Sequence, residues 1–180
     1  EKSVGKDVKI FVKDRLGKTI ANCDSSNKKA DDRRKPSSYE GLNRFVWDLT
    51  EDGPIVLDNS LKVKKYEPFS KKGGGPSGAK VNPGKYKVVL DVDGDVKDRE
   101  LEVICDPRIE VSEDDLVLQH DLYGSVLSKL SELNIAVNRI RLMKQQLQNM
   151  HKIIPDESEK VDVLVEQLDK IEGQLIDTKR

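Results

Sequence analysis

Residues 41–49 read Gly-Leu-Asn-Arg-Phe-Val-Trp-Asp-Leu and contain the only tryptophan of the chain. In a strand, alternate side chains point to opposite faces, which would place Phe45, Trp47 and Leu49 on one bulky apolar face. An indole ring is costly to leave in water, and its N–H needs an acceptor when it is buried. The stretch therefore predicts a strand whose Trp47 side packs against a second layer of extended chain.

Length and composition limit the class of protein to which the chain can belong. Its 180 residues suffice for one medium domain, or for a small domain with an appendage. Charged and hydrophobic residues each make up 36%, and 32 basic side chains nearly balance 33 acidic ones. The resulting net charge of −1 gives no general attraction to nucleic acid or to membrane surfaces. No apolar run is long enough to cross a bilayer, so we expect neither a nucleic-acid partner nor a membrane span.

Four further segments carry the alternation and turn signals of strands. Asp14 to Gly17 and Asp93-Gly94 are turn sequences in which glycine can adopt a positive φ. Each turn is flanked by two runs rich in β-branched residues, which predicts two hairpins. The predicted strands are residues 7–12, 18–22, 85–92 and 99–104.

Two polar segments interrupt the strand pattern. Residues 24–38 and 55–80 are rich in lysine, serine and other polar residues, and the second contains a glycine run without the lysine and hydroxyl of a phosphate loop. We expect both segments to be mobile loops. The strands between them predict a small antiparallel β-sandwich over residues 1–108, as the first part of an α+β chain.

A long helix is predicted directly after this region. Ser112 and Asp115 have the spacing of a capping box, and the acids of the first turn suit the helix dipole. Apolar residues then repeat as heptads to about residue 150, before Pro155 breaks the pattern. A second helix is predicted at about 157–178, and the short connection makes the two helices antiparallel neighbours. Residues 109–180 are therefore predicted to form a two-helix antiparallel hairpin resembling a coiled coil.

The apolar stripes of this hairpin are wider than two helices can cover. Lys144 and His151 interrupt the seam of the first helix near its far end. On the second helix we expect the many acidic side chains to point outward, to solvent. A further helix or a partner is expected to complete the packing. The predicted seam of the second helix is Val161, Leu164, Leu168, Ile171 and Leu175.

The sequence predicts no metal site and no cofactor. Cys23 and Cys105 are the only cysteines, and the two histidines lie far apart in the sequence. Two free thiols are the favoured interpretation, with a single inter-sheet disulfide as the alternative. The Asp91, Asp93, Asp95 triplet is similar to the start of a calcium loop, but its glycine stands at the fourth place instead of the sixth, which favours a plain hairpin turn.

Several motifs together resemble a known family. The 41–49 stretch, Asn82-Pro83-Gly84-Lys85-Tyr86 and the Asp93-Gly94 turn are similar to the Ig-like domain of flagellar hook-capping proteins. Asp106-Pro107-Arg108 and the helical Asn138-Arg139-Ile140-Arg141 extend the resemblance. With them the chain resembles the C-terminal region of large secreted bacterial proteins with sortilin-like, Asp-box (neuraminidase-repeat) β-propellers, often classed as glycosyl hydrolases.

This resemblance implies an Ig-like sandwich and a secreted, periplasmic or cell-surface parent protein. The chain departs from the family in its lysine-rich loops and its two cysteines. It contains no Asp-box motif (S-x-D-x-G-x-x-W), so any hydrolase site would belong to a propeller outside these residues. We therefore expect the chain to be a piece of a larger protein.

The favoured function is a non-catalytic accessory or interaction module. The sandwich would dock on the parent's propeller, and the helical hairpin would pack on another protein or form a homo-oligomer. The alternatives are a carbohydrate-binding module that uses loop aromatics, and part of a glycoside hydrolase whose active site lies outside this chain. No catalytic residue is assigned, because no spacing selects a pair of acids. The candidate ligand or interaction surface is Tyr39, Tyr66, Phe69, Leu130, Val137, Leu168 and Leu175.

Overall fold

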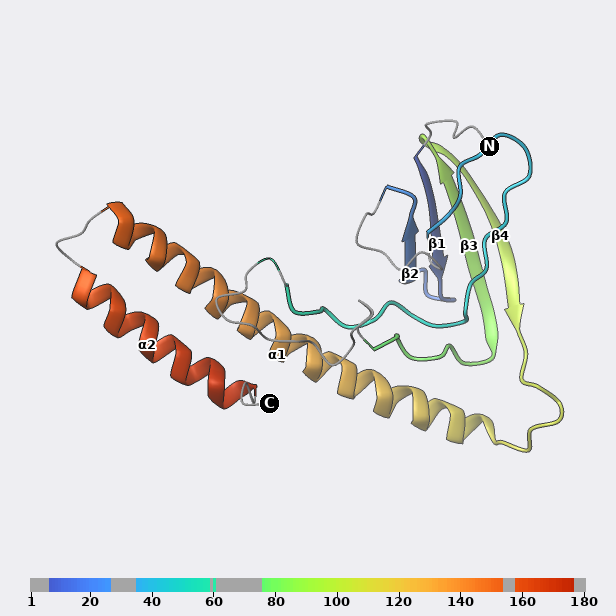
Figure 1. The fold of residues 1–180 in the computed structure, drawn as a ribbon. Helices are drawn as coiled ribbons and strands as arrows, with labels where there is room; N and C mark the ends of the chain where they lie inside the picture. Colours follow the sequence, from blue (N-terminus) through green and yellow to red (C-terminus); the bar gives the residue numbers. More distant parts are fainter. Residues whose placement is uncertain (1–6, 27–34, 59, 61–75, 154–157, 177–180) are drawn as a thin grey trace. The chain divides into compact units, whose positions relative to one another are not determined.

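The computed structural model describes residues 7–26, 35–58, 60, 76–153 and 158–176 (Figure 1). Four antiparallel strands and two helices make the chain α+β, as predicted. The predicted mobile loops lie partly outside the described residues, as do Tyr66 and Phe69. The elements are β1 (Val8–Lys13), β2 (Thr19–Asp24), β3 (Gly84–Val92), β4 (Asp95–Val103), α1 (Glu113–Ile153) and α2 (Ser158–Leu175).

The strands form one sheet in the order β2-β1-β3-β4. Val12 on the middle strand β1 lies opposite Ala21 of the outer strand β2 on one side and Val88 of β3 on the other. At the β3–β4 hairpin, Asp93 and Gly94 have φ angles of 52° and 91°. Positive φ at both turn positions matches the right-handed twist of the strands. The four strands and both hairpins predicted from the sequence are confirmed.

The core of the sheet unit is small and lies where β1 and β2 meet. Val12, Ile20 and Ala21 are buried there, and Trp47, Val81 and Tyr86 pack against them, half-buried. The rings of Trp47 and Tyr86 meet edge to face, with centroids 6.1 Å apart. The Trp47 indole N–H donates to the carbonyl of Thr50 at 2.9 Å. The ring therefore packs on the sheet and its N–H finds an acceptor, as expected, while the two-layer sandwich around it stays a prediction.

The strand predicted at residues 41–49 is wrong, although its alternation is right. Phe45 and Trp47 are half-buried and Val46 is exposed, but residues 42–48 form no sheet ladder. Asn43 explains the difference, because its side chain accepts from the backbone N–H of Tyr39 and donates to the carbonyls of Tyr39 and Gly41. Such side-chain bonds satisfy backbone groups locally and compete with a ladder.

Regular pairing resumes only at the end of this stretch. Leu49 takes a positive φ of 57°, and Thr50 then bridges Lys80. The backbone N–H of Asp52 donates to Ile20 at the edge of β2, while its carboxylate accepts from the N–H of Asn22. Residues 50–52 therefore occupy hydrogen-bonding groups of the outer strand, which shields that edge from pairing with another chain.

The chain divides into two compact units, which we describe separately. The first comprises residues 1–53 and 76–125, and the second comprises residues 54–75 and 126–180. This division assigns the start of α1 to the unit that contains the sheet, whereas the predicted domain boundary lies at 108/109. Independent folding of the predicted domains 1–108 and 109–180 stays a prediction.

Helix α1 begins with the predicted cap. The backbone N–H of Asp115 donates to the Ser112 hydroxyl at 3.1 Å, and that hydroxyl donates to the Asp115 carboxylate at 2.7 Å. Asp115 therefore closes the cap through the Ser112 side chain and not through its backbone. The helix continues for 41 residues, and Gly124 is tolerated within it.

In the second unit, α2 runs alongside the C-terminal part of α1 in the opposite direction (Figure 1). The contacts give the register, because Arg141 pairs with Glu172 while Lys144, further along α1, also reaches the earlier Asp169. The two-helix antiparallel hairpin is present. Of its predicted seam on α2, Val161 is buried and Leu168 half-buried, whereas Leu164, Ile171 and Leu175 are exposed, so the coiled-coil packing stays a prediction.

Replacing Trp47 tests how much the sheet unit depends on the indole. We expect Trp47→Ala to lower the free energy of unfolding by about 2 kcal/mol, since the half-buried ring loses its contacts and its hydrogen bond. Val46→Ala is the control, because Val46 is 61% exposed, and it should change stability by less than about 0.5 kcal/mol. Urea unfolding followed by circular dichroism measures both. Equal effects would contradict the assigned core.

Alanine substitutions at two glycines should change the stability in opposite directions. A Cβ at Gly78 would overlap the backbone carbonyl of Glu51, whereas one at Gly124 would meet no atom within 4 Å. Gly78→Ala should therefore cost about 1–3 kcal/mol. Gly124→Ala, in a helix interior, should stabilise by up to about 1 kcal/mol. The same unfolding experiment decides, and stabilisation by Gly78→Ala would show that residues 51 and 78 do not touch.

Candidate functional site

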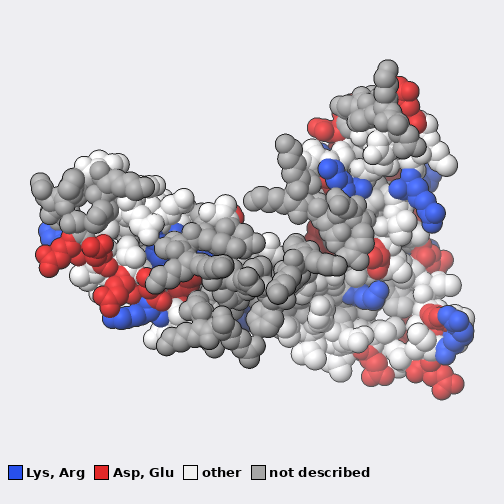
Figure 2. Space-filling model, in the orientation of Figure 1, with Lys and Arg blue, Asp and Glu red and all other residues white. Residues whose placement is uncertain are grey.

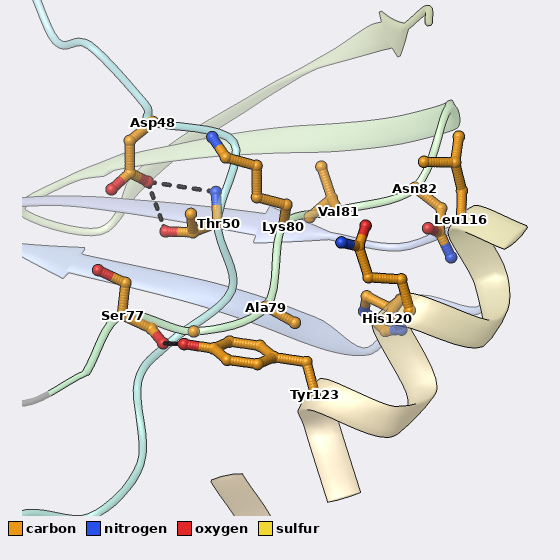
Figure 3. A pocket seen from close by; sticks show the side chains of 12 residues that line it. Asp48, Thr50, Ser77, Ala79, Lys80, Val81, Asn82, Leu116, His120 and Tyr123 are labelled. Carbon is orange, nitrogen blue, oxygen red and sulfur yellow. Dashed lines mark hydrogen bonds between the residues drawn. The ribbon is translucent and has the colours of Figure 1, made fainter. Parts of the chain in front are cut away.

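A groove of about 560 Å³ lies within the sheet-containing unit (Figure 3). Its volume falls in the range of roughly 300–1,000 Å³ that is usual for small-molecule sites. Three pieces of chain form its walls: the end of the Trp47 stretch, the extended segment before β3, and the first turns of α1. The lining residues are Asp48, Thr50, Ser77, Gly78, Ala79, Lys80, Val81, Asn82, Leu116, Gln119, His120 and Tyr123.

One wall is fixed by a short network around Thr50. The Asp48 carboxylate accepts from the Thr50 hydroxyl at 2.6 Å and from its backbone N–H at 3.2 Å. The Thr50 carbonyl accepts from Trp47, and the backbone of Thr50 pairs with that of Lys80. The residues that place Trp47 in the core therefore also place Asp48 and Thr50 on the groove.

The opposite wall belongs to α1. His120 Nε2 lies 3.1 Å from Glu51 Oε1, and the Tyr123 hydroxyl donates to the Ser77 carbonyl at 3.3 Å. Figure 3 shows the Tyr123 ring lying along the bottom of the view, with its hydroxyl turned toward Ser77. The first contact holds the helix to the end of the Trp47 stretch and the second holds it to the extended segment before β3, while Tyr123 remains 41% exposed.

The lining is short of the groups that catalysis requires. Asp48 is the only carboxylate among the lining residues, and it is hydrogen-bonded to Thr50. Glycoside hydrolysis ordinarily uses two carboxyl groups across the scissile bond. His120 is oriented by Glu51, but no Ser, Thr or Cys nucleophile is hydrogen-bonded to it in the part of the chain that the structure describes.

The second unit contains a buried ion cluster that joins α1 to α2. Arg141 Nε donates to Glu172 at 2.8 Å, and Lys144 Nζ donates to both Glu172 and Asp169. The side chains of Arg141, Lys144 and Glu172 are only 4%, 2% and 11% exposed. Ions this deeply buried are strongly destabilising unless they are paired. The cluster therefore fixes how the two helices face each other.

Burial and ion pairing have opposite effects on the pKa values of Lys144 and Glu172 in this cluster. Burial lowers the pKa of Lys144, but its hydrogen bonds to Asp169 and Glu172 outweigh burial and raise it. Burial raises the pKa of Glu172, but the hydrogen bonds from Lys144 and Arg141 outweigh it and lower the pKa. In each case the charged form is favoured, so the cluster is a set of ion pairs at neutral pH.

The rotation of α2 differs from the prediction. Glu172 and Asp169, predicted on the outer side, face α1 in the structure, while Leu164 and Ile171, predicted in the seam, are each 46% exposed. The physical reason is that Arg141 and Lys144 occupy the seam of α1 and require carboxylates opposite. The remaining acidic side chains gather over the first turns of α2 (Figure 2).

This rotation leaves an apolar side face on the hairpin. Its members are 39–50% exposed. At 3.6 residues per turn, the members on each helix lie roughly a third of a turn around the helix axis from the residues of the ion cluster. The direction of this rotation is the same on α1 and on α2. Because the helices are antiparallel, both stripes then come to the same side of the pair. The apolar side face consists of Met143 and Met150 of α1 and Leu164, Ile171 and Leu175 of α2.

A tether that the sequence analysis missed holds residues 55–58 to α1. Asn134 donates to the carbonyl of Ile55, and Asn138 bridges the carbonyl of Val56 and the N–H of Asp58. These residues were predicted to lie in a mobile loop, but their backbone is bound along the helix. A signal was present, since the two asparagines stand four residues apart and so share one helix face.

The residues of the predicted ligand or interaction surface differ in their exposure in the structure. Tyr39 is 44% exposed but does not line the groove, and Val137 is fully buried, so Val137 belongs to the core and not to a surface. Leu130 and Leu168 are half-buried. Leu175 is 39% exposed and belongs to the apolar side face. Tyr66 and Phe69 lie outside the described residues.

The cysteines and acids form no metal site in the described ranges, where no group of three or more potential ligands occurs. Cys23 is buried, Cys105 is exposed and the two are not joined by a disulfide, in agreement with the favoured interpretation. Asp91 accepts from the N–H of Gly94, and Asp93 from the N–H of Asp7, so these two acids shape the hairpin turn. None of the described helices is both long and apolar enough to cross a bilayer.

Comparison with known proteins gives no match of any kind: no protein-family model, no curated protein and no solved structure matches the chain.

Removing one member of the ion cluster should separate the helices. We expect Glu172→Gln to cost about 3–5 kcal/mol, because Arg141 and Lys144 lose their shared carboxylate. Glu166→Gln is the matched control on the same helix: Glu166 pairs with Lys170 while both remain exposed, so its loss should cost less than about 0.5 kcal/mol. Helical circular dichroism in urea measures both. Similar costs would contradict burial of the cluster.

The cluster also predicts a pH window. The pKa of Glu172 is lowered from 4.5, so its stabilisation is complete above that value and is lost as pH falls through the lowered pKa. The pKa of Lys144 is raised from 10.5, so its stabilisation is complete below that value and is lost as pH rises through the raised pKa. Thermal unfolding from acid to alkaline pH should show this plateau, and Glu172→Gln should weaken the decline at its acid end.

Proposed function

We propose that the chain is a non-catalytic interaction module whose helical hairpin associates with a further helix through the apolar side face. The observation that carries the proposal is the exposure of Leu164 and Ile171, which the ion cluster turns away from α1. An exposed apolar stripe along one side of a helix pair is typical of a helix bundle from which one or more helices are absent.

A second copy of the hairpin is the partner that this face fits. None of the five residues of the apolar side face is charged, so these residues themselves bring no like charges together when two copies meet. The glutamines Gln146, Gln167 and Gln174 stand beside it on the two helices and add no charge. Two antiparallel hairpins joined through such faces would make a four-helix arrangement with a shared apolar interior.

We further propose a role and a lineage for the sheet unit. The Trp47 stretch packs on the core of the sheet, and this packing supports the proposal that it serves as the second layer of an Ig-like sandwich. The quoted motifs support descent from the C-terminal region of secreted proteins with sortilin-like propellers. On this proposal the sheet unit docks on the parent's propeller, and the module acts outside the cytoplasm.

Self-association can be tested with charges placed on the apolar side face. Sedimentation equilibrium and light scattering should give about twice the chain mass of 20.3 kDa for the native protein. Ile171→Asp should weaken association by about tenfold or more, because it places an unpaired charge in the interface. Helical circular dichroism should be unchanged, since residue 171 is exposed in the single chain.

Val163→Asp is the matched control. Val163 is 50% exposed but lies on the side of α2 that points away from α1, so this change should leave the mass unchanged. A native protein that stays monomeric at high concentration would contradict self-association, and equal effects of the two variants would show that the apolar side face is not the interface.

A further inference from the structure

We propose that the groove of the sheet-containing unit binds a short, uncharged carbohydrate. The site is formed by Tyr123, Gln119 and Asn82, and it is separate from the hairpin surface proposed above. It is also distinct from the loop aromatics that the sequence suggested for sugar binding, because Tyr39 is not among its lining residues.

Tyr123 supplies the flat apolar surface. Its side chain is 41% exposed and lines the groove, while its hydroxyl is tied to Ser77. A ring held at its far end keeps one orientation, so it can receive a ligand without first being ordered. The negative face of an aromatic ring attracts the C–H groups on the apolar side of a pyranose. Leu116 and Val81 extend the apolar lining.

Two carboxamides supply the polar contacts. Asn82 and Gln119 both line the groove, and across the described ranges neither side-chain amide makes a hydrogen bond. Each amide has two donors and an acceptor oxygen, which suits the neighbouring hydroxyls of a sugar that donate and accept at once. Both amides gain partners when a sugar binds, whereas an apolar ligand would leave them without partners.

The charge of the lining favours a neutral ligand. Lys80 and Asp48 are its two formal charges besides His120, and they are of opposite sign. Figure 3 shows the Lys80 side chain extending toward the side of the groove where Asp48 and Thr50 lie. An anionic or cationic ligand would therefore meet one like charge for each opposite one. With a single carboxylate present, the groove can hold a glycoside without the second acid that its hydrolysis requires.

The test uses the whole chain and three neutral trisaccharides: cellotriose, maltotriose and triacetylchitotriose. We expect at least one of them to shift the NMR signals of the Asn82 and Gln119 side-chain amides and of backbone residues 77–82. Tyr123→Ala should then weaken binding of that sugar by about three- to tenfold, as expected for loss of an aromatic contact. Tyr123→Phe keeps the ring but removes the hydroxyl bond to Ser77 that orients it, so it should weaken binding less than Tyr123→Ala does.

Tyr39→Ala is the matched control, because Tyr39 is 44% exposed and outside the groove, and it should leave the affinity unchanged. Three results would overturn the proposal: no trisaccharide shifts these signals, Tyr39→Ala weakens binding as much as Tyr123→Ala, or diglycine or glucuronate binds more tightly than every neutral sugar. None of these results bears on self-association of the hairpin, so the two proposals fail independently.

Discussion

Glu172 accepts hydrogen bonds from Arg141 and Lys144 at a place where water reaches none of the three side chains freely. A buried guanidinium or ammonium is costly without a carboxylate, so only a narrow range of α2 rotations about its axis satisfies both cations. That constraint selects which apolar residues of α2 face α1 and which are left on the side of the pair. The proposed interaction surface is a direct consequence of these ion pairs.

The sheet-containing unit depends on a comparable local constraint. Trp47 packs on the sheet and donates to Thr50, and the same short segment bridges Lys80 and places Asp48 on the groove. Adjacent residues of one stretch therefore pack on the sheet and line the groove in which we propose that a ligand binds. The half-buried aromatic ring packs against the core, whereas the polar residues beside it line a groove whose opposite wall is α1.

Local rules predicted much of the fold. The hairpin at Asp93-Gly94, the cap at Ser112 and the end of α1 at Ile153 depend on residues close in sequence, and such signals can be read without the tertiary structure. The rotation of α2 could not be read this way, because it depends on pairs such as Arg141 with Glu172 that join distant residues. The i, i+3 spacing of Arg141 and Lys144, matched by Asp169 and Glu172, was the available signal. The groove was missed for the same reason, since its walls come from three separate segments.

The central claim is that the ion cluster turns an apolar side face outward for association, and Met143 and Met150 report on that face directly. They are the only methionines of the chain and are 50% and 49% exposed. NMR of ¹³C-methyl methionine with a soluble paramagnetic probe measures their accessibility as protein concentration rises. Our account predicts that both methyl signals are strongly broadened by the probe in dilute protein and become protected on association. Methyl groups that are shielded in the dilute monomer, or equally accessible at every concentration, would contradict it.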